Sequence, residues 1–198
     1  MIGALRIPFF IGLSLAIAFS GGVAATKIAL DAEDPFDVLE IGPWVANPLA
    51  QTAGANPYDK ARRALGDGSG LGQAEGLVFR ATTDSSGAPL LASCAYVVGG
   101  QVPASRVWIM RLTGLSGEIT HADPPFSRAM HSASVLRGPD GAFEIGLGAE
   151  ARSGNWLFMS GDGPFGIEFL LFDTPAAGNF GLIDLEMPEI ERQDCADA

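Results

Sequence analysis

Residues 154–175, GNWLFMSGDGPFGIEFLLFDTP, decide the fold of this chain. They form two apolar runs joined by a Gly/Asp/Pro turn. In the second run, apolar residues occupy every other position, the period of one face of a β-strand: Phe165, Ile167, Phe169 and Leu171. Two such strands cannot bury an apolar face by themselves, so further strands must cover it. The stretch therefore predicts a multi-stranded β-domain.

The same alternation recurs earlier in the chain. Residues at 77–82, 108–112 and 143–147 follow the same alternation, a further run covers 92–98, and turns rich in Gly, Pro and Asp separate these runs. Short alternating strands at this spacing are typical of antiparallel sandwiches and jelly rolls. We therefore expect a mainly β body over residues 41–198, built as an antiparallel jelly-roll-like sandwich.

One short helix is expected at the start of this body. Asn56 and Pro57 supply an N-cap and a first helical position, and Gly66 supplies a stop. Before it, Pro43 and Pro48 indicate an edge strand, because proline lacks the N–H that a central strand donates.

The N-terminal segment is apolar. Residues 7–26 carry no charge and would reach about 30 Å as a helix, the thickness of the hydrocarbon core of a membrane. We interpret residues 1–30 as a membrane anchor, followed by an acidic linker over 31–40. A cleaved signal peptide is the alternative, because Val23-Ala24-Ala25 would suit a signal peptidase. A buried core helix is the third interpretation.

The charge excludes one class of partner. The formal net charge is −11, and beyond residue 30 the chain holds 10 basic against 23 acidic residues, a balance of −13. Such a surface repels phosphate backbones, so nucleic acid is not an expected partner. Arg6 in the short leading tail favours an N-terminus inside and an exported body.

The chain has two cysteines, Cys94 and Cys195. In an exported protein, an even pair favours a disulfide, which would fasten the acidic tail (184–198) to the strand that carries Cys94. Two free thiols are the alternative.

Four segments together resemble the bacterial domain of unknown function DUF 1214: residues 55–65, 72–98, 134–145 and 153–175. The resemblance implies a β-rich, jelly-roll-like module in a short membrane-anchored form. It supports pairing of Cys94 with Cys195, and it brings no established reaction. The predicted location is the bacterial inner membrane, with a single span and the body in the periplasm.

Metal and nucleophile motifs are missing from the sequence. His121 and His131 are the only histidines and are ten residues apart, so no metal site of jelly-roll type is expected. Ser69 lies in a glycine-rich loop without the strand-turn-helix context of a nucleophile elbow. We expect no cofactor and no metal.

Carboxylates are the remaining candidates for chemistry, since two that converge could act on a glycosidic bond. They are Glu75, Glu144, Glu168 and Asp173. Glu144 alternates with core residues and should face solvent, whereas Glu168 shares a face with Leu170 and could lie beneath a loop or partner.

The second set of candidates is Asn155 and Trp156, which could form a platform for a sugar. Core packing is the alternative for Trp156. Glu75, Asn155, Trp156 and Glu168 are thus the candidate binding residues. Our first hypothesis is a non-catalytic envelope module that binds a partner protein or a carbohydrate. The alternative is a carboxylate-dependent hydrolase acting on envelope carbohydrate.

Overall fold

The computed structural model describes residues 2–31, 38–50, 52–65, 71–72, 74–115, 117–120, 126–179 and 185–195. The chain divides into two compact units, residues 1–35 and 36–198. In the first unit, α1 (Ile2–Asp31) is one continuous helix. Its portion Arg6–Leu30 is long and apolar enough to cross a membrane, a property that membrane anchors and signal sequences share. The predicted linker lies mostly on residues outside those described.

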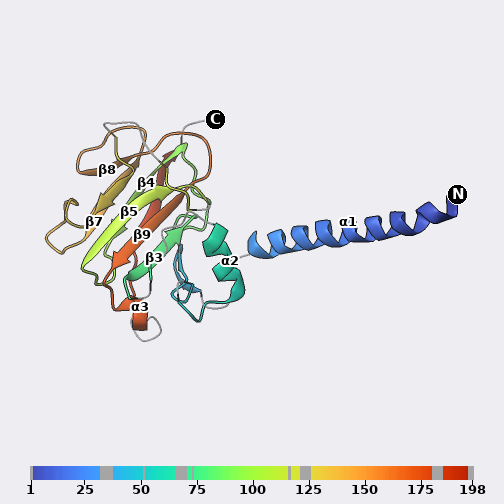
Figure 1. Ribbon diagram of the computed structural model, residues 1–198. Coiled ribbons are helices and arrows are strands. Elements are labelled where there is room, and N and C mark those ends of the chain that lie inside the picture. The colour runs from blue at the N-terminus through green and yellow to red at the C-terminus, as the bar shows by residue number, and fades with distance from the viewer. Residues whose placement is uncertain are drawn as a thin grey trace. The chain divides into compact units, whose positions relative to one another are not determined.

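The second unit consists of two β-sheets and two short helices (Figure 1). The six-stranded sheet has the order β1 (Leu39–Ile41), β2 (Trp44–Ala46), β3 (Gly76–Ala81), β9 (Gly166–Phe172), β5 (Val107–Thr113), β6 (Ala129–His131). The four-stranded sheet has the order β10 (Glu189–Cys195), β4 (Cys94–Gly100), β7 (Phe143–Gly148), β8 (Asn155–Phe158). The helices are α2 (Pro57–Leu65) and α3 (Ala176–Asn179).

The alternating stretch predicted to organise the fold is β9, in the middle of the larger sheet. It pairs antiparallel with β3 on one side and with β5 on the other. Ile167, Phe169 and Leu171 are fully buried on its inner face. This confirms the strand and the face that the sequence predicts.

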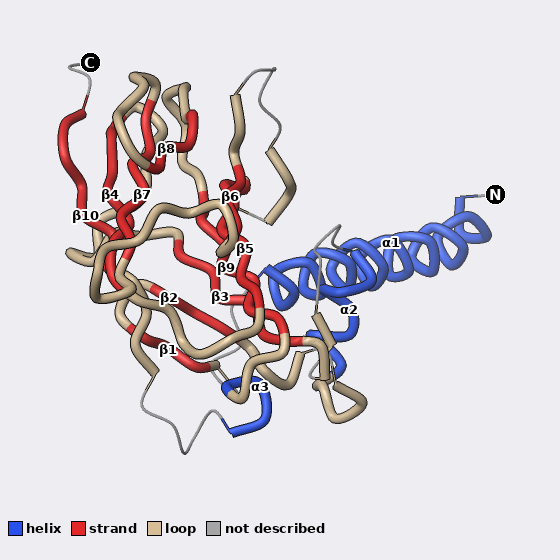
Figure 2. Tube along the Cα trace, turned by 90° about the vertical axis from the view of Figure 1, so that its left-hand side faces the viewer, coloured by secondary structure: helices blue, strands red, loops and turns tan. Residues whose placement is uncertain are grey.

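The two sheets pack against each other through aromatic side chains. Trp108 of β5 contacts Phe143 of β7, with ring centroids 5.0 Å apart, and also Phe169 of β9, at 5.3 Å. Trp44 also contacts the Phe169 ring, at a centroid distance of 5.2 Å. Figure 2 shows the strands of the two sheets as separate groups. The core therefore lies between the sheets, as expected of a mainly β body.

The prediction of a wholly antiparallel fold is wrong at one strand pair, because β8 runs parallel to β7. Residues 149–154 return along the sheet, so that Asn155 starts beside Ile145. Arg152 of this return lies beside Gly146, since its Cδ would be 3.5 Å from a Cβ built on the glycine, an ordinary contact distance. The narrower assignment to a jelly roll remains a prediction.

The predicted helix is confirmed as α2. The side-chain oxygen of Asn56 accepts a hydrogen bond from the backbone N–H of Asp59 at 2.8 Å, which is an N-cap. The proline-flanked strands β1 and β2 lie at an edge of the larger sheet, as expected. Within the acidic tail, Glu189–Cys195 forms the edge strand β10.

Candidate functional site

The outer face of the four-stranded sheet carries a groove of about 640 Å³. Its floor comes from β4 and β7, one side comes from β10, and its end walls are the loops around residues 136–142 and 152–155. Ligand sites are commonly clefts of about 300–1,000 Å³. We therefore take this groove as the candidate site.

In one row of the floor, a glycine lies between two glutamates, one on each neighbouring strand. Gly99 on β4 pairs with Glu189 of β10 and with Glu144 of β7. Neighbouring strands lie about 4.8 Å apart, so the Cα atoms of the two glutamates are about 10 Å apart. A Cβ on Gly99 would lie 3.4 Å from Cγ of Glu144. The glutamate side chain thus lies beside the space above the glycine.

The next row contains Glu191, Val97, Gly146 and Trp156, in that order across the four strands. Arg152 lies over Gly146. Val97 therefore separates this arginine from Glu191 in the row. The two rows thus combine carboxylates, a guanidinium group and a floor with few side chains.

The charged groups of the groove are available to a ligand. Five charged residues line the groove. Asp140 accepts a hydrogen bond from the backbone N–H of Ala142 at 3.1 Å. The other four, Glu144, Arg152, Glu189 and Glu191, are all exposed. Within the described part of the chain, none of these four side chains has a hydrogen-bond or ion-pair partner. We call them the groove charges. The three carboxylates can accept hydrogen bonds from hydroxyl or ammonium groups, and the guanidinium group of Arg152 can donate hydrogen bonds.

Asn155, a candidate binding residue, lies at the end of the groove and has a structural role. Its side-chain N–H groups donate to the carbonyl oxygens of Leu136 and Glu144, both at 2.8 Å. Its side-chain oxygen accepts from the backbone N–H of Leu136 at 2.7 Å. The amide therefore fixes the end-wall loop to β7, and little of its hydrogen-bonding capacity is left for a ligand.

Trp156, the second member of the predicted platform, lies half-buried on the outer face, whereas its neighbour Leu157 enters the core. Its indole N–H donates to the carbonyl oxygen of Gly148 at 3.2 Å. Rings of Phe126 and Phe158 contact it edge-on, at centroid distances of 6.0 and 6.1 Å. The tryptophan therefore lies against the sheet at the margin of the groove.

Glu168 lies on β9, on the outer face of the other sheet, and is 1% exposed. Arg80 and Arg111 occupy the paired positions on β3 and β5. Each arginine donates from Nε and Nη2 to one oxygen of the carboxylate. Gly117 approaches from above, because a Cβ there would clash with the guanidinium group of Arg80. Of the two covers considered for Glu168, a loop or a partner, the structure thus shows a loop residue over its row.

The remaining candidate carboxylates lie away from the groove. The Glu75 side chain accepts a hydrogen bond from the backbone N–H of Gly72 at 2.9 Å, and Asp173 forms an ion pair with Arg106. Both acids are exposed, and a backbone hydrogen bond of 2.9 Å connects them. Of the four carboxylates considered in the sequence, the groove contains Glu144 alone.

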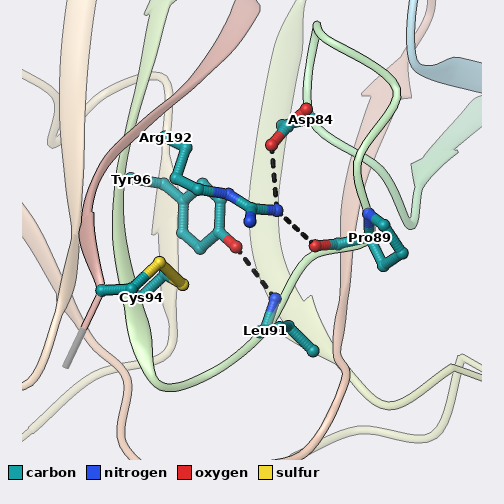
Figure 3. The surroundings of a disulfide bond; sticks show 7 residues. Asp84, Pro89, Leu91, Cys94, Tyr96 and Arg192 are labelled. Carbon is teal, nitrogen blue, oxygen red and sulfur yellow. Dashed lines mark hydrogen bonds and ion pairs between the residues drawn. A yellow bond between two sulfur atoms is a disulfide. The ribbon is translucent and has the colours of Figure 1, made fainter. Parts of the chain in front are cut away.

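Strand β10, one side of the groove, is held at both ends. Cys195 forms a disulfide with Cys94, 101 residues earlier, which confirms the predicted bridge (Figure 3). At the other end, the indole N–H of Trp44 donates to the carbonyl oxygen of Pro188 at 2.7 Å. Ser85 exchanges hydrogen bonds with the backbone of Ile190 at 2.8 and 2.9 Å. The carboxylates of β10 are thus held in place above the floor.

Arg192 ties β10 to the loop that follows β3. Its Nη2 donates to the carbonyl oxygen of Pro89 at 2.6 Å and lies 3.0 Å from Oδ2 of Asp84 (Figure 3). Burial alone would raise the pKa of Asp84, but hydrogen bonds from Ser86 and Ala88 and the charge of Arg192 hold the pKa below its ordinary value. Asp84 therefore remains ionised and supports the strand.

Sequence reasoning missed the groove charges on β10 and in the return loop. Glu189 and Glu191 flank Ile190, and this alternation could have identified a strand with an acidic outer face. Arg152 gave no such signal. The described residues include no group of three or more potential metal ligands. His131 is exposed on β6, and His121 and Ser69 are outside the described part of the chain.

Comparisons with known proteins identify relatives without an assigned role. The chain resembles the VPA0106 protein from Vibrio parahaemolyticus (22% identity, TM-score 0.54, covering 70% of this chain and 36% of that one). It also resembles an uncharacterized protein from Burkholderia cenocepacia (19%, 0.46, covering 94% and 44%). The chain thus spans less than half of the length of each. No curated protein matches it.

The family comparison covers the strands that build both sheets. The model of DUF1214, described as a protein of unknown function, matches residues 75–176, which are 102 of the 198 residues. The matched segment contains β3, β4, β5, β6, β7, β8 and β9. The chain therefore belongs to the DUF1214 family.

Proposed function

We propose that this chain is a single-pass module of the bacterial inner membrane, whose body lies in the periplasm and binds a partner or ligand in the outer-face groove without catalysis. The apolar helix α1 supplies a segment able to cross the bilayer. The disulfide supports an oxidising compartment, because such bonds are rare in the reducing cytosol.

The observation that carries the binding role is the contrast between two sets of charged residues. Glu168 on the larger sheet is buried and is bonded to two arginines. The groove charges, in contrast, are exposed over a floor that contains Gly99 and Gly146. A structural role explains Glu168, whereas among the described residues the groove charges have no side-chain hydrogen bond or ion pair that would account for them.

Membrane attachment can be tested by alkaline extraction of membranes. A retained anchor keeps the full-length protein in the membrane pellet, because α1 remains embedded in lipid. Release of a shortened protein into the soluble fraction would show a cleaved signal peptide. Protease added to spheroplasts should digest the body if it faces the periplasm, and protection of the body would contradict that orientation.

The groove can be tested by photo-crosslinking in living cells. Leu136 is 67% exposed and lines the groove, whereas Tyr58 is 48% exposed on α2. A photoreactive phenylalanine at position 136 should give a specific adduct, and the same residue at position 58 should not. Gly99→Val should remove the adduct, because the new side chain fills the floor. Equal adducts from both positions would contradict the proposal.

The alternative, a hydrolase of envelope carbohydrate, is supported by the Glu144 and Glu189 row. Their Cα separation of about 10 Å allows the carboxyl groups to reach the roughly 6.5–9.5 Å of inverting glycosidases. The test is release of reducing ends from purified envelope glycans. If Glu144→Gln and Glu189→Gln each abolish this activity and Glu40→Gln leaves it unchanged, the protein is a hydrolase and the non-catalytic proposal is wrong.

A further inference from the structure

Three aromatic rings lie together at the margin of the groove: Phe126, Trp156 and Phe158. We call them the aromatic shelf. Phe126 and Phe158 stack with ring centroids 4.5 Å apart, and the Trp156 ring contacts both edge-on. Phe126 is 44% exposed, and the other two are half-buried. The shelf thus offers apolar ring surface to the solvent, which core packing does not require.

The aromatic shelf is continuous with the groove floor. A Cβ on Gly146 would lie 4.0 Å from Cδ1 of Trp156 and 3.5 Å from Cδ of Arg152. The same glycine therefore touches the shelf and one of the groove charges. A ligand lying along this row would contact aromatic carbon at one end and the carboxylate of Glu191 at the other.

The chemistry of the groove matches a sugar chain. Pyranose rings have apolar C–H faces, which pack on aromatic rings, and hydroxyl groups at their edges, which donate to carboxylates and accept from a guanidinium group. The groove charges supply three carboxylates and one guanidinium group. Their balance is negative, and the exported body has the same sign. Anionic polysaccharides are therefore repelled.

We propose that the groove and the aromatic shelf together bind a neutral oligosaccharide with flat pyranose faces. The inference rests on the groove being the binding site, and it adds the chemical class of the ligand. The shelf contacts the ring faces, the groove charges contact the hydroxyl groups, and Gly99 adds no side chain to the floor beneath the sugar chain.

The experiment uses full-length protein in lipid nanodiscs and isothermal titration with three probes. Cellohexaose is the neutral glycan, a hexamer of galacturonic acid is the anionic glycan, and octalysine represents a basic peptide. Cellohexaose should bind with a Kd of about 1 mM or tighter, and the anionic hexamer should not bind. Gly99→Val should abolish cellohexaose binding, because it fills the shared floor.

The shelf is tested by Phe126→Ala, with Tyr58→Ala as the matched control, since both rings are about half exposed. Loss of one aromatic contact should weaken cellohexaose binding by about threefold to tenfold, and the control should leave the affinity unchanged. Both variants should melt at the temperature of the wild type, which separates binding from folding.

Three results would overturn the inference and leave the groove in place. Octalysine binding that Gly99→Val removes, without cellohexaose binding, would assign the groove to a basic peptide. If Phe126→Ala leaves the affinity for cellohexaose unchanged, the aromatic shelf is not part of the binding site. Absence of cellohexaose binding, combined with a groove-specific crosslink from position 136, would likewise reject the glycan and retain the proposed function. Absence of both would reject the groove itself.

Discussion

Arg111 and Glu168 lie directly opposite each other on β5 and β9, and Nε and Nη2 of the arginine both donate to Oε2 of the glutamate, at 2.8 and 2.6 Å. Arg80 bonds the other carboxylate oxygen from β3. A buried carboxylate between two cations therefore joins the three central strands of the larger sheet. The charge of Glu168 is compensated, and the fold requires it there.

Replacing Glu168 with glutamine should destabilise the protein strongly. The substitution leaves two guanidinium groups in a partly buried row without their anion, which typically costs about 3–5 kcal/mol. Urea denaturation of the wild type and of Glu168→Gln measures the difference in free energy of unfolding. Glu144→Gln is the control, because that side chain is exposed and should change stability by less than about 0.5 kcal/mol. Equal effects would contradict a structural role for Glu168.

Removing the disulfide should loosen β10 first. In Cys195→Ser, the loss of a bridge across 101 residues should lower the free energy of unfolding by about 2–5 kcal/mol. Hydrogen exchange should rise most in Glu189–Cys195 and little in the central strand β9. A uniform rise over both sheets would show that the bridge stabilises the whole body and does not specifically hold the side of the groove.

The contribution of Asp84 should depend on pH. Its pKa is depressed in the folded state, so its stabilising effect is complete above the ordinary value of 3.8 and is lost as pH falls through the lower folded value. The melting temperature of Asp84→Asn should therefore be well below that of the wild type at pH 7. The difference between the two melting temperatures should narrow below about pH 4. A gap that is constant from pH 7 to pH 3 would show that the charge is not responsible.

Gly76 should not tolerate a side chain. A Cβ at this position would lie 1.9 Å from the carbonyl oxygen of Leu171 on the neighbouring strand, and a backbone atom within a sheet cannot move away easily. Gly76→Ala should cost more than about 3 kcal/mol or prevent folding. At Gly163, no atom lies within 4 Å of the added Cβ, so Gly163→Ala should fold normally. Circular dichroism and thermal melting of both variants compare the two sites.

Much of the fold could be predicted from periodicity. Alternation of apolar residues located β9 and its inner face, and the proline-flanked segment located the edge strands. The parallel pairing of β7 and β8 could not be predicted in this way, because alternation is the same in parallel and antiparallel strands. That pairing depends on the return of residues 149–154, which places Asn155 beside Ile145 and leaves no periodic pattern in the sequence.

The site was less accessible to sequence reasoning. Alternation predicted correctly that Glu144 faces solvent. It could not show that Glu189, 45 positions later, lies across Gly99 in the same row, because strand order within a sheet is a property of the folded chain. Glu168 attracted attention as an acid among apolar residues, and the two arginines that explain it come from separate strands.

The central claim is that the outer face of the four-stranded sheet is a binding surface. Hydrogen exchange of the full-length protein in nanodiscs, measured with and without saturating cellohexaose, tests this claim most directly. We predict protection in Val97–Gly100, Phe143–Gly146 and Glu189–Glu191, the strand segments around the groove. Amides of β3 and β5 in the other sheet should be unchanged. Protection confined to those two strands, or an exchange pattern that cellohexaose leaves unaltered, would contradict the account.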